Sequence, residues 1–514
     1  MTRQPDAPPT RATPTLSRRL ARWCVRAAVL VAAIVGTIVM VRAFASRALP
    51  ELQPHHTVEL AGDLQADDAD GMTFEGLMAL EADLFRELDA EIYAANARES
   101  LASPPRRHGL VRYARGSLSD PDAQDTNWNR SWELIPERVR GGVLLLHGLT
   151  DSPYSMRSIG EVFHEHGYYV LALRMPGHGT IPAALLETTW QDWMAAVRIG
   201  ARHVRQQAGD GRLILGGYST GGGLALRLTL ESLKDDTLPR VDGIYMFSPA
   251  IGVSSLGAFS GWHRALSWLP YFERFKWLGV SPEYDPFKYA SFPKNAGRQV
   301  HLLTRAVQAA LDSATTGGRL GDLPPIITFQ SVVDTTVDTN AVITHLYDRL
   351  SGPGHELILF DINRSAYLEP FMRNSFRVDA TRLEQHVNLR YRLTVVTNSS
   401  PEVADVIARS RGAGAPAATE TLGLAWPAGF FSLSHVAIPF PPDDPIYGWA
   451  PGATLPLGRL EVRGERRLLR IPAEDILRLR HNPFFPYLEQ RLDTLLDREE
   501  AEDASREAAL SGTP

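Results

Sequence analysis

The sequence predicts an α/β fold, a mostly parallel central sheet flanked by helices, with a helical cap. Three observations predict it. Short apolar runs alternate with amphipathic stretches, one run leads through a glycine-flanked serine into a helix of small residues, and an aromatic-rich segment too long for a plain crossover interrupts the alternation. Because strands buried on both faces are continuously apolar, each run is interpreted as one strand. The predicted strands are 132–136, 143–146, 169–173, 213–215, 243–247, 326–329 and 356–360.

Composition limits the kinds of protein that the chain can be. Its 514 residues are 44% hydrophobic and 22% charged, enough to bury a sizeable core. A single cysteine excludes a disulfide framework and any cysteine-rich metal site. Because 53 Lys and Arg stand against 59 Asp and Glu, there is no bulk positive field for a phosphate backbone, and nucleic acid is not an expected partner. The length allows roughly two to four domains, or one large domain with insertions.

The first fifty residues contain an apolar run that predicts a membrane-spanning helix. Residues 27–41 form 15 uncharged positions between Arg26 and Arg42. A span needs about 20 residues, and residues 23–25 together with snorkelling arginines extend this run to a feasible length. Arginines precede the run and acidic residues follow it, which places the N-terminus in the cytoplasm.

We therefore expect a cytoplasmic tail over residues 1–24 and a transmembrane signal-anchor over 25–45. The chain would be a single-pass protein of the inner (cytoplasmic) membrane, with the rest exported to the periplasmic or extracellular side. The alternative is a signal peptide cleaved after Ala43-Phe44-Ala45, and we favour the uncleaved anchor because Arg42 interrupts the approach to that site. A buried core helix is a third interpretation, against which the charge asymmetry argues.

Residues 46–130 are assigned to a linker and an N-terminal helical extension. The stretch 50–71 is polar and rich in Pro, His and Asp, and it is expected to make no core. Apolar residues then recur at spacings of three, four and seven, which predicts an amphipathic helix over 74–95 with Thr73 as its N-cap.

The α/β domain is assigned to residues 131–490. Two gaps between its strands are longer than a crossover requires, and they predict a cap over 251–300 and an insertion over 364–425 with an extra strand near 389–396. The end of the chain, 491–514, is highly charged and is expected to be a disordered tail.

The glycine-flanked serine carries the clearest chemical signal. Gly-Tyr-Ser-Thr-Gly at residues 217–221 follows the run 213–215 and opens a helix of small residues. This order predicts a nucleophile elbow, a turn so tight that the serine is strained and glycine is needed on both sides. The helix start directs N–H groups and a dipole at the serine, which favours negative charge there. Ser219 is therefore the predicted nucleophile.

A second motif, His147-Gly148-Leu149, ends the buried strand 143–146. The glycine lets the backbone turn so that the next N–H faces the reaction centre. The N–H groups of Leu149 and Thr220 are therefore predicted to form an oxyanion hole. His147 is expected to brace this loop and not to hold a metal, because no second ligand stands at a metal-like spacing, and no metal site is expected.

A serine nucleophile needs a histidine base and an acid that orients it, and in this arrangement the chain order is Ser, acid, His. Asp334 follows the predicted strand 326–329, where a loop would reach the histidine, and it is the predicted acid. Asp338 is the alternative, and its other role would be to cap a helix that begins near Asn340. Asp361, after the following strand, is a third candidate.

Five histidines follow Asp334, and their positions decide among them. His435 lies in a loop between turn residues and apolar anchors, so we predict it as the general base. The others are expected within a helix, at a strand entry, in the polar insertion and before the last helix: they are His345, His355, His386 and His481.

With the predicted nucleophile, acid, base and oxyanion loop in place, the chain resembles the α/β-hydrolase superfamily. His-Gly-Leu-Thr-Asp-Ser-Pro at 147–153, Arg-Met-Pro-Gly-His-Gly at 174–179 and Trp-Gln-Asp-Trp at 190–193 resemble the bacterial carboxylesterase, monoacylglycerol lipase and lysophospholipase group. Some members of this group are described as serine aminopeptidases (S33). The resemblance covers roughly residues 130–360 and 425–490.

The resemblance implies a cofactor-free serine hydrolase with a mobile cap over an acyl pocket. Its expected reaction is hydrolysis of a lipid or other acyl ester through an acyl-enzyme, with His147, Tyr218, Trp262 and Trp268 expected at the substrate pocket. The expected partners are a small-molecule or lipid ester and, through the N-terminal helix, the membrane, while the oligomeric state is left open. A serine peptidase of the same fold and a catalytically silent, membrane-tethered binding protein are the alternatives.

Overall fold

The computed structural model describes residues 16–47, 50–100, 109–252, 270–371, 389–412, 415–449, 455–459, 471, 475 and 477–511. The chain divides into two compact units, and each is described by itself. One unit holds the helix α1 (Leu16–Arg47) and the 3-10 segment Pro270–Lys276. The other holds the central sheet and the helices packed on it.

The structure does not support the predicted membrane-spanning helix at 25–45. These residues lie within α1, yet no helix in the part of the chain that the structure describes is long and apolar enough to cross a bilayer. The apolar run at 27–41 is bounded by Arg26 and Arg42, and its 15 residues fall short of the about 20 that a span requires. Export of the α/β domain stays a prediction.

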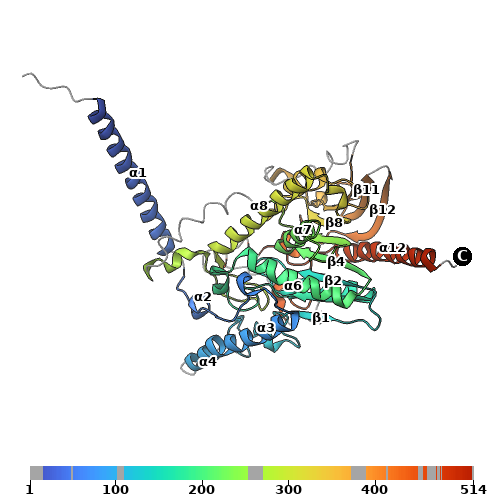
Figure 1. Ribbon diagram of the computed structural model, residues 1–514, viewed down its shortest axis with the longest axis horizontal. Helices are drawn as coiled ribbons and strands as arrows, with labels where there is room; N and C mark the ends of the chain where they lie inside the picture. Colours follow the sequence, from blue (N-terminus) through green and yellow to red (C-terminus); the bar gives the residue numbers. More distant parts are fainter. Residues whose placement is uncertain are drawn as a thin grey trace, which may run out of the picture. The chain divides into compact units, whose positions relative to one another are not determined.

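The central sheet is mostly parallel and extends beyond the predicted strands. Within the described residues it has ten strands in the order β1-β3-β2-β4-β5-β8-β9-β10-β11-β12 (Figure 1). Neighbours from β3 to β10 pair in parallel, whereas β1 at one edge and β11 and β12 at the other pair antiparallel. The strands are β1 Trp132–Leu134, β2 Gly141–Leu146, β3 Tyr168–Leu173, β4 Arg212–Tyr218, β5 Gly243–Phe247, β8 Ile326–Ser331, β9 Glu356–Phe360, β10 Arg392–Asn398, β11 Asp405–Gly412 and β12 Ala415–Ala425.

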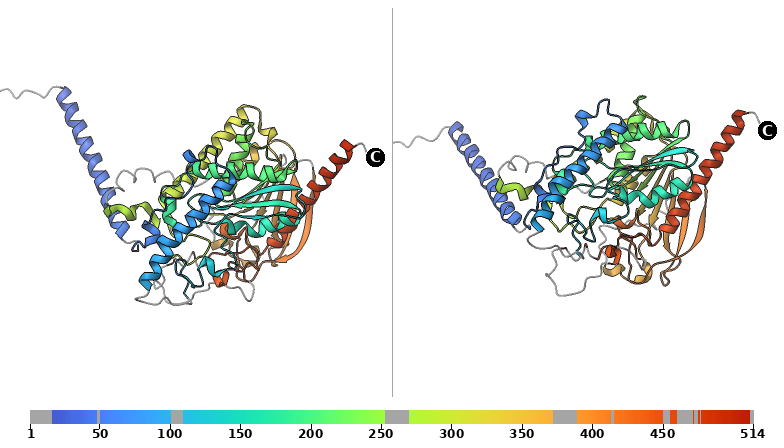
Figure 2. Two further views of the ribbon diagram at one scale, coloured as in Figure 1. Left: turned by 60° about the horizontal axis from the view of Figure 1, so that its bottom comes forward. Right: turned by 90° about the horizontal axis from the view of Figure 1, so that it is seen from below.

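Helices cover both faces of the sheet, which confirms the predicted architecture (Figure 2). Alternate side chains of β2 show the two cores: Leu144 and Leu146 pack with α6, α7 and α8, whereas Val143 and Leu145 pack with α5 and α12. The helices of this unit are α2 Pro54–Thr57, α3 Phe74–Leu88, α4 Ala94–Ser100, α5 Arg157–Glu165, α6 Trp190–Ala208, α7 Thr220–Ser232, α8 Lys294–Thr316, α9 Thr339–His345 and α12 Phe485–Ser511.

The stretch predicted as a linker without a core is instead packed against the domain. Leu64 is buried in the core beneath α6, and the Ala66 N–H donates to Oδ1 of Asp192 at 2.8 Å. The stretch contains few apolar residues, so its composition resembles a linker, but those few side chains and its carboxylates find buried partners. The predicted helix beyond it is present, with Oγ1 of Thr73 accepting from the Gly76 N–H at 3.2 Å, and it continues through a π-turn into α4.

The two predicted additions to the domain are described to different extents. In the predicted cap at 251–300, residues 253–269 lie outside the described residues. The described part that belongs to the domain forms two short strands, and α8 then begins on the face of the sheet. These strands are β6 Trp277–Gly279 and β7 Phe292–Pro293. In the insertion at 364–425, β10 confirms the predicted strand near 389–396, and β11 and β12 extend the sheet further.

The prediction of a disordered tail at 491–514 is wrong up to residue 511. Residues 491–511 belong to α12. The apolar side chains of this helix that are buried against the sheet include Leu488, Leu492, Leu495 and Leu496. Their spacings of four, three and one place them on one face of a helix, and the charged residues between them occupy the solvated faces. The high overall charge of this segment therefore predicted disorder although one face of the helix is apolar and buried.

This packing predicts a large loss of stability when α12 loses one buried leucine. Leu492 is fully buried, so Leu492→Ala should lower the free energy of unfolding by about 2–5 kcal/mol, measured by urea unfolding. Gln490→Ala is the matched control, because Gln490 is exposed on the same helix, and it should change stability by less than about 0.5 kcal/mol. Equal effects of the two substitutions would contradict a docked α12.

Candidate active site

Ser219 stands at a sharp turn between the end of β4 and the start of α7. Its backbone has φ 53° and ψ −115°, a conformation that costs a non-glycine residue about 1–3 kcal/mol. A side chain at either flanking glycine would collide with backbone: a Cβ on Gly217 would lie 2.4 Å from the carbonyl of Gly221, and one on Gly221 would lie 2.1 Å from the Leu146 oxygen. The predicted strand, tight turn and helix are therefore present, and both glycines are sterically required.

Three side chains that are distant in the sequence form one hydrogen-bonded line. Nε2 of His435 lies 3.1 Å from Oγ of Ser219, and Nδ1 of His435 lies 2.7 Å from Oδ2 of Asp334. Asp334 follows β8, and His435 begins the short 3-10 helix His435–Ala437. All three residues are buried, with Ser219 the most exposed at 8%. The structure thus brings together the predicted nucleophile, base and acid.

The Asp334 carboxylate is fixed by donors on both oxygens. Oδ1 accepts from the N–H groups of Thr336 and Val337 at 2.8 and 3.0 Å, and Oδ2 accepts from Nε2 of Gln330 at 3.1 Å as well as from His435. Burial alone raises the pKa of Asp334, but His435 and these donors lower the pKa below its usual value. The group is therefore held as the anion that a histidine base needs as its partner.

The alternative acids occupy other positions. Asp338 caps α9, its Oδ1 accepting from the Asn340 N–H at 2.9 Å, which is the second role predicted for it. Asp361 pairs with Nε of Arg364 at 2.9 Å and accepts from Oγ1 of Thr397 at 2.8 Å. Among the described residues neither is hydrogen-bonded to His435, so the geometry favours Asp334.

The alternative bases are also placed elsewhere. His345 ends α9 and is exposed, and His355 accepts from the Ile326 N–H through Nδ1 at 3.2 Å. His481 is buried between Phe430 and Trp449, with ring centroids at 5.8 and 6.0 Å. The remaining histidine, at position 386, lies outside the described residues.

Two backbone N–H groups beside Ser219 are free of protein acceptors. Thr220 is the first residue of α7, so its N–H has no intrahelical partner, and Leu149 follows the end of β2. Among the described residues no acceptor is hydrogen-bonded to either N–H. The next residue, Thr150, has φ 67°, which turns the chain sharply after Leu149. Two unpaired donors at a helix start can bind a developing negative charge.

His147 and Tyr218, which were expected at the substrate pocket, have supporting positions instead. His147 is fully buried; its Nε2 accepts from the Met175 N–H at 3.1 Å and its Nδ1 contacts the Gly148 oxygen at 2.9 Å, so it braces the loop as predicted. Burial and the nearby His178 hold its pKa well below the usual value. Tyr218 is 1% exposed and its hydroxyl donates to the His435 oxygen at 3.5 Å. The other two expected pocket residues, at 262 and 268, lie outside the described residues.

A cavity of about 290 Å³ lies next to this arrangement. Val436 and Thr150 line it, and they adjoin His435 and Leu149 in the chain. Its lining also combines rings with charged groups of both signs: Tyr284, Tyr289, Phe440, Tyr447, Lys288, Arg478, Arg480, Asp285 and Asp475. A ligand held here would meet both apolar surface and hydrogen-bond donors.

Sequence reasoning missed one ion pair beside the oxyanion loop. Nζ of Lys288 lies 2.7 Å from Oδ1 of Asp151, and both side chains are mostly buried, with 16% and 6% exposed. Burial raises the pKa of Asp151, and Lys288 only partly offsets this effect. Asp151 could have been noted from its place just after the oxyanion loop, but nothing in the sequence indicates that its partner is Lys288.

Comparisons with known proteins found similarity to a hydrolase family and to two curated enzymes. Residues 137–361 match the family model described as serine aminopeptidase, S33. A thermostable monoacylglycerol lipase from Bacillus sp. (strain H-257) is 34% identical over 117 residues, which are 23% of this chain and 44% of that protein. A carboxylesterase from Bacillus subtilis (strain 168) is 34% identical over 96 residues, 18% of this chain and 39% of that protein.

The chain spans less than half the length of these two curated relatives. Among solved structures, a metagenome-derived lipolytic enzyme matches at 23% identity with a TM-score of 0.37, over 48% of this chain and 97% of that one.

The bonds to Asp334 predict how stability depends on pH. A carboxyl whose pKa is lower in the folded chain contributes stability above its unfolded pKa of about 3.9, and this contribution is lost as the pH falls through the folded pKa. The loss of unfolding free energy caused by Asp334→Asn should therefore be largest above about pH 5 and shrink below about pH 4, measured by urea unfolding across this range. Ser219→Ala removes no titrating group, so its effect should change little with pH. A penalty for Asp334→Asn that grows on acidification would contradict an ionised Asp334.

Proposed function

We propose that the chain hydrolyses carboxylic esters, with Ser219 as nucleophile, His435 as general base and Asp334 as the orienting acid. Its similarity to a hydrolase family over residues 137–361 and to two curated ester hydrolases supports this proposal. The observation that carries the proposal is the hydrogen-bonded line from Asp334 through His435 to Ser219, which stands at a strained turn. No cofactor takes part in the proposed reaction.

The first half of the reaction forms an acyl-enzyme. Nε2 of His435 takes the proton of the Ser219 hydroxyl as Oγ attacks the ester carbonyl, and the Nδ1–H bond to Asp334 keeps the imidazole in the tautomer with Nε2 free. The carbonyl oxygen becomes an oxyanion that accepts from the N–H groups of Leu149 and Thr220, each worth a few kcal/mol in the transition state. His435 then gives its proton to the leaving alcohol.

The second half returns the enzyme to its starting state. Water donates a proton to Nε2 of His435 as its oxygen attacks the acyl carbon, and the oxyanion forms again at the same two N–H groups. Collapse of this intermediate releases the acid and returns the proton to Oγ of Ser219. His435 and the two N–H groups play the same part in both halves, whereas Ser219 is the nucleophile in the first half and the leaving group in the second.

A lipid or other acyl ester is the proposed substrate. Support comes from the two relatives, described as a monoacylglycerol lipase and a carboxylesterase, and from the aromatic lining of the cavity beside His435. The cationic groups of the same lining suit a polar alcohol half. Because the chain matches less than half of each relative, the substrate stays a proposal.

A serine peptidase is the second candidate, because the matching family model is described as a serine aminopeptidase. Its chemistry would use the same three side chains, but the leaving group would be an amine. Comparing kcat/KM on p-nitrophenyl esters with kcat/KM on aminoacyl p-nitroanilides separates the two functions. A higher kcat/KM on the anilides than on the esters would support the peptidase function and contradict the esterase function.

The proposal predicts which substitutions abolish turnover. Ser219→Ala should lower kcat on p-nitrophenyl butyrate by about 10⁴-fold or more and abolish labelling by a fluorophosphonate. Asp334→Asn should lower kcat by about 10⁴-fold, because the histidine would then be held in the wrong tautomer.

Asp338→Asn is the matched control for Asp334→Asn. Asp338 lies four residues away and caps α9, so its substitution should leave kcat unchanged and cost about 1 kcal/mol of stability at most. Full turnover by folded Ser219→Ala would rule out Ser219 as the nucleophile, and equal losses at positions 334 and 338 would rule out Asp334 as the acid.

A further inference from the structure

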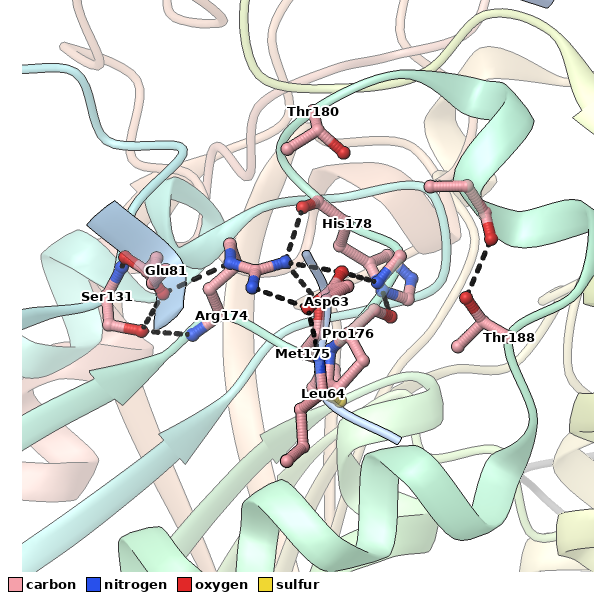
Figure 3. Close-up of polar contacts among 12 residues, drawn as sticks. Asp63, Leu64, Glu81, Ser131, Arg174, Met175, Pro176, His178, Thr180 and Thr188 are labelled. Atoms are coloured by element: carbon pink, nitrogen blue, oxygen red, sulfur yellow. Dashed lines mark hydrogen bonds and ion pairs between the residues drawn. The ribbon is translucent and has the colours of Figure 1, made fainter. Parts of the chain in front are cut away.

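Two acidic residues of the N-terminal extension hold the loop that follows β3. Oδ1 and Oδ2 of Asp63 accept from Nη2 and Nη1 of Arg174 at 2.8 and 3.1 Å, and Oε2 of Glu81 accepts from Nε at 3.1 Å (Figure 3). The side chains of Arg174, Glu81 and Asp63 are 1%, 6% and 17% exposed, so water competes little for these bonds. The guanidinium is engaged on two edges by a segment that precedes the α/β domain in the chain.

The same two carboxylates also hold backbone groups. Oδ2 of Asp63 accepts from the Gly177 N–H at 2.7 Å, and the oxygens of Glu81 accept from the N–H and the hydroxyl of Ser131, each at 2.8 Å. Oγ of Ser131 in turn accepts from the Arg174 N–H at 2.8 Å. The loop 174–177 is therefore fixed at its first residue and at its fourth.

This loop in turn fixes the histidine that braces the oxyanion loop. The N–H of Met175, next to Arg174, donates to Nε2 of His147 at 3.1 Å. With Nε2 accepting, Nδ1 carries the proton and donates to the oxygen of Gly148 at 2.9 Å, one residue before the free N–H of Leu149. A continuous path of short contacts thus leads from the two carboxylates to a donor of the proposed oxyanion hole.

The charges of Arg174 and its two carboxylate partners are essential to this arrangement. A buried guanidinium is tolerated only when its partners neutralise and hydrogen-bond it, and removal of one partner leaves an uncompensated charge. Arg174 would then reorient toward water and move its own backbone N–H and that of Met175. An oxyanion hole acts through donors preorganised at the position of the developing charge, so a small displacement lowers the rate.

We propose that Asp63 and Glu81 are positioning residues for ester hydrolysis: through Arg174, Met175 and His147 they set the position of the Leu149 N–H in the oxyanion hole. The N-terminal extension then belongs to the catalytic unit. This inference rests on the proposed function, because it assigns a role in the reaction of Ser219.

The experiment compares Asp63→Asn and Glu81→Gln with the wild-type full-length chain. Each substitution keeps the shape of the side chain and removes its charge. On p-nitrophenyl butyrate we expect kcat to fall about tenfold with KM unchanged, a smaller loss than the about 10²–10³-fold that follows removal of a hole donor. The inhibition constant of phenylboronic acid, which places an oxygen in the hole, should rise by the same factor. Faster hydrogen exchange of the peptide that contains residues 147–150 should accompany both changes.

Asp83→Asn is the matched control. Asp83 lies on the same helix as Glu81, but it pairs with Arg86 at the surface, with 62% of its side chain exposed. This variant should keep the kcat, KM and boronate affinity of the wild-type chain. If Asp63→Asn does not fold, Ser131→Ala is decisive, because it removes the hydroxyl between Glu81 and the Arg174 N–H while both charges stay in place. It should lower kcat by a smaller factor in the same direction.

The outcomes separate this inference from the proposed function. A wild-type chain that neither hydrolyses the ester nor reacts with a fluorophosphonate at Ser219 overturns both. An active wild-type chain with unchanged kcat in folded Asp63→Asn and Glu81→Gln, or in folded Ser131→Ala where the first does not fold, overturns only the positioning role. A merely structural role would lower the melting temperature and leave kcat and boronate affinity at their wild-type values.

Discussion

The close approach of α7 to the end of β2 is the constraint on which the rest of the site depends. A Cβ on Gly221 would lie 2.1 Å from the Leu146 oxygen, so only glycine lets the first turn of the helix reach the strand. This contact places the loop after β2 beside the start of α7 and turns Ser219 into its strained conformation. The strain costs about 1–3 kcal/mol and is offset by the surrounding packed sheet. The proposed binding of one oxyanion by the N–H groups of both Leu149 and Thr220 depends on this contact.

The sheet order then brings the other groups to the same edge. β2, β4, β5 and β8 are consecutive parallel neighbours, so the residues that follow them emerge at one edge, where α/β sheets bind their ligands. Ser219 follows β4 and Asp334 follows β8. His435 enters from beyond β12, and its segment is tied back where Oγ of Ser331 donates to the Leu433 oxygen at 2.7 Å. The base is thus the one member of the line that the parallel strands do not deliver directly.

This difference explains how much could be predicted from the sequence. The strands and the elbow are local patterns. Apolar runs mark β2, β3, β4, β5, β8 and β9, and Gly217 and Gly221 flank the serine, so the fold class and the nucleophile could be predicted without a structure. The docked stretch around Leu64 and the buried face of α12 were missed because each has polar or charged composition and gains its apolar contacts from distant segments. The strands β11 and β12 were missed because neither contains a continuous apolar run. Propensity and composition give no access to such long-range partners.

The groups that would carry out the reaction and the groups that would control its rate and substrate also come from different parts of the chain. Ser219 and Asp334 follow strands that the sequence predicts, whereas many of the groups around them come from the additions to the core sheet. The cavity beside His435 is lined by Thr150, by residues of the segments 281–292 and 436–447, and by Ile471, Asp475, Arg478 and Arg480. None of these residues is part of a strand of the central sheet. In the proposed oxyanion loop, His147 accepts from the Met175 N–H, and the neighbouring Arg174 is bonded to acids that precede β1. Substrate choice and rate would therefore change through these additions while the elbow stays the same, which is how one fold supports many reactions.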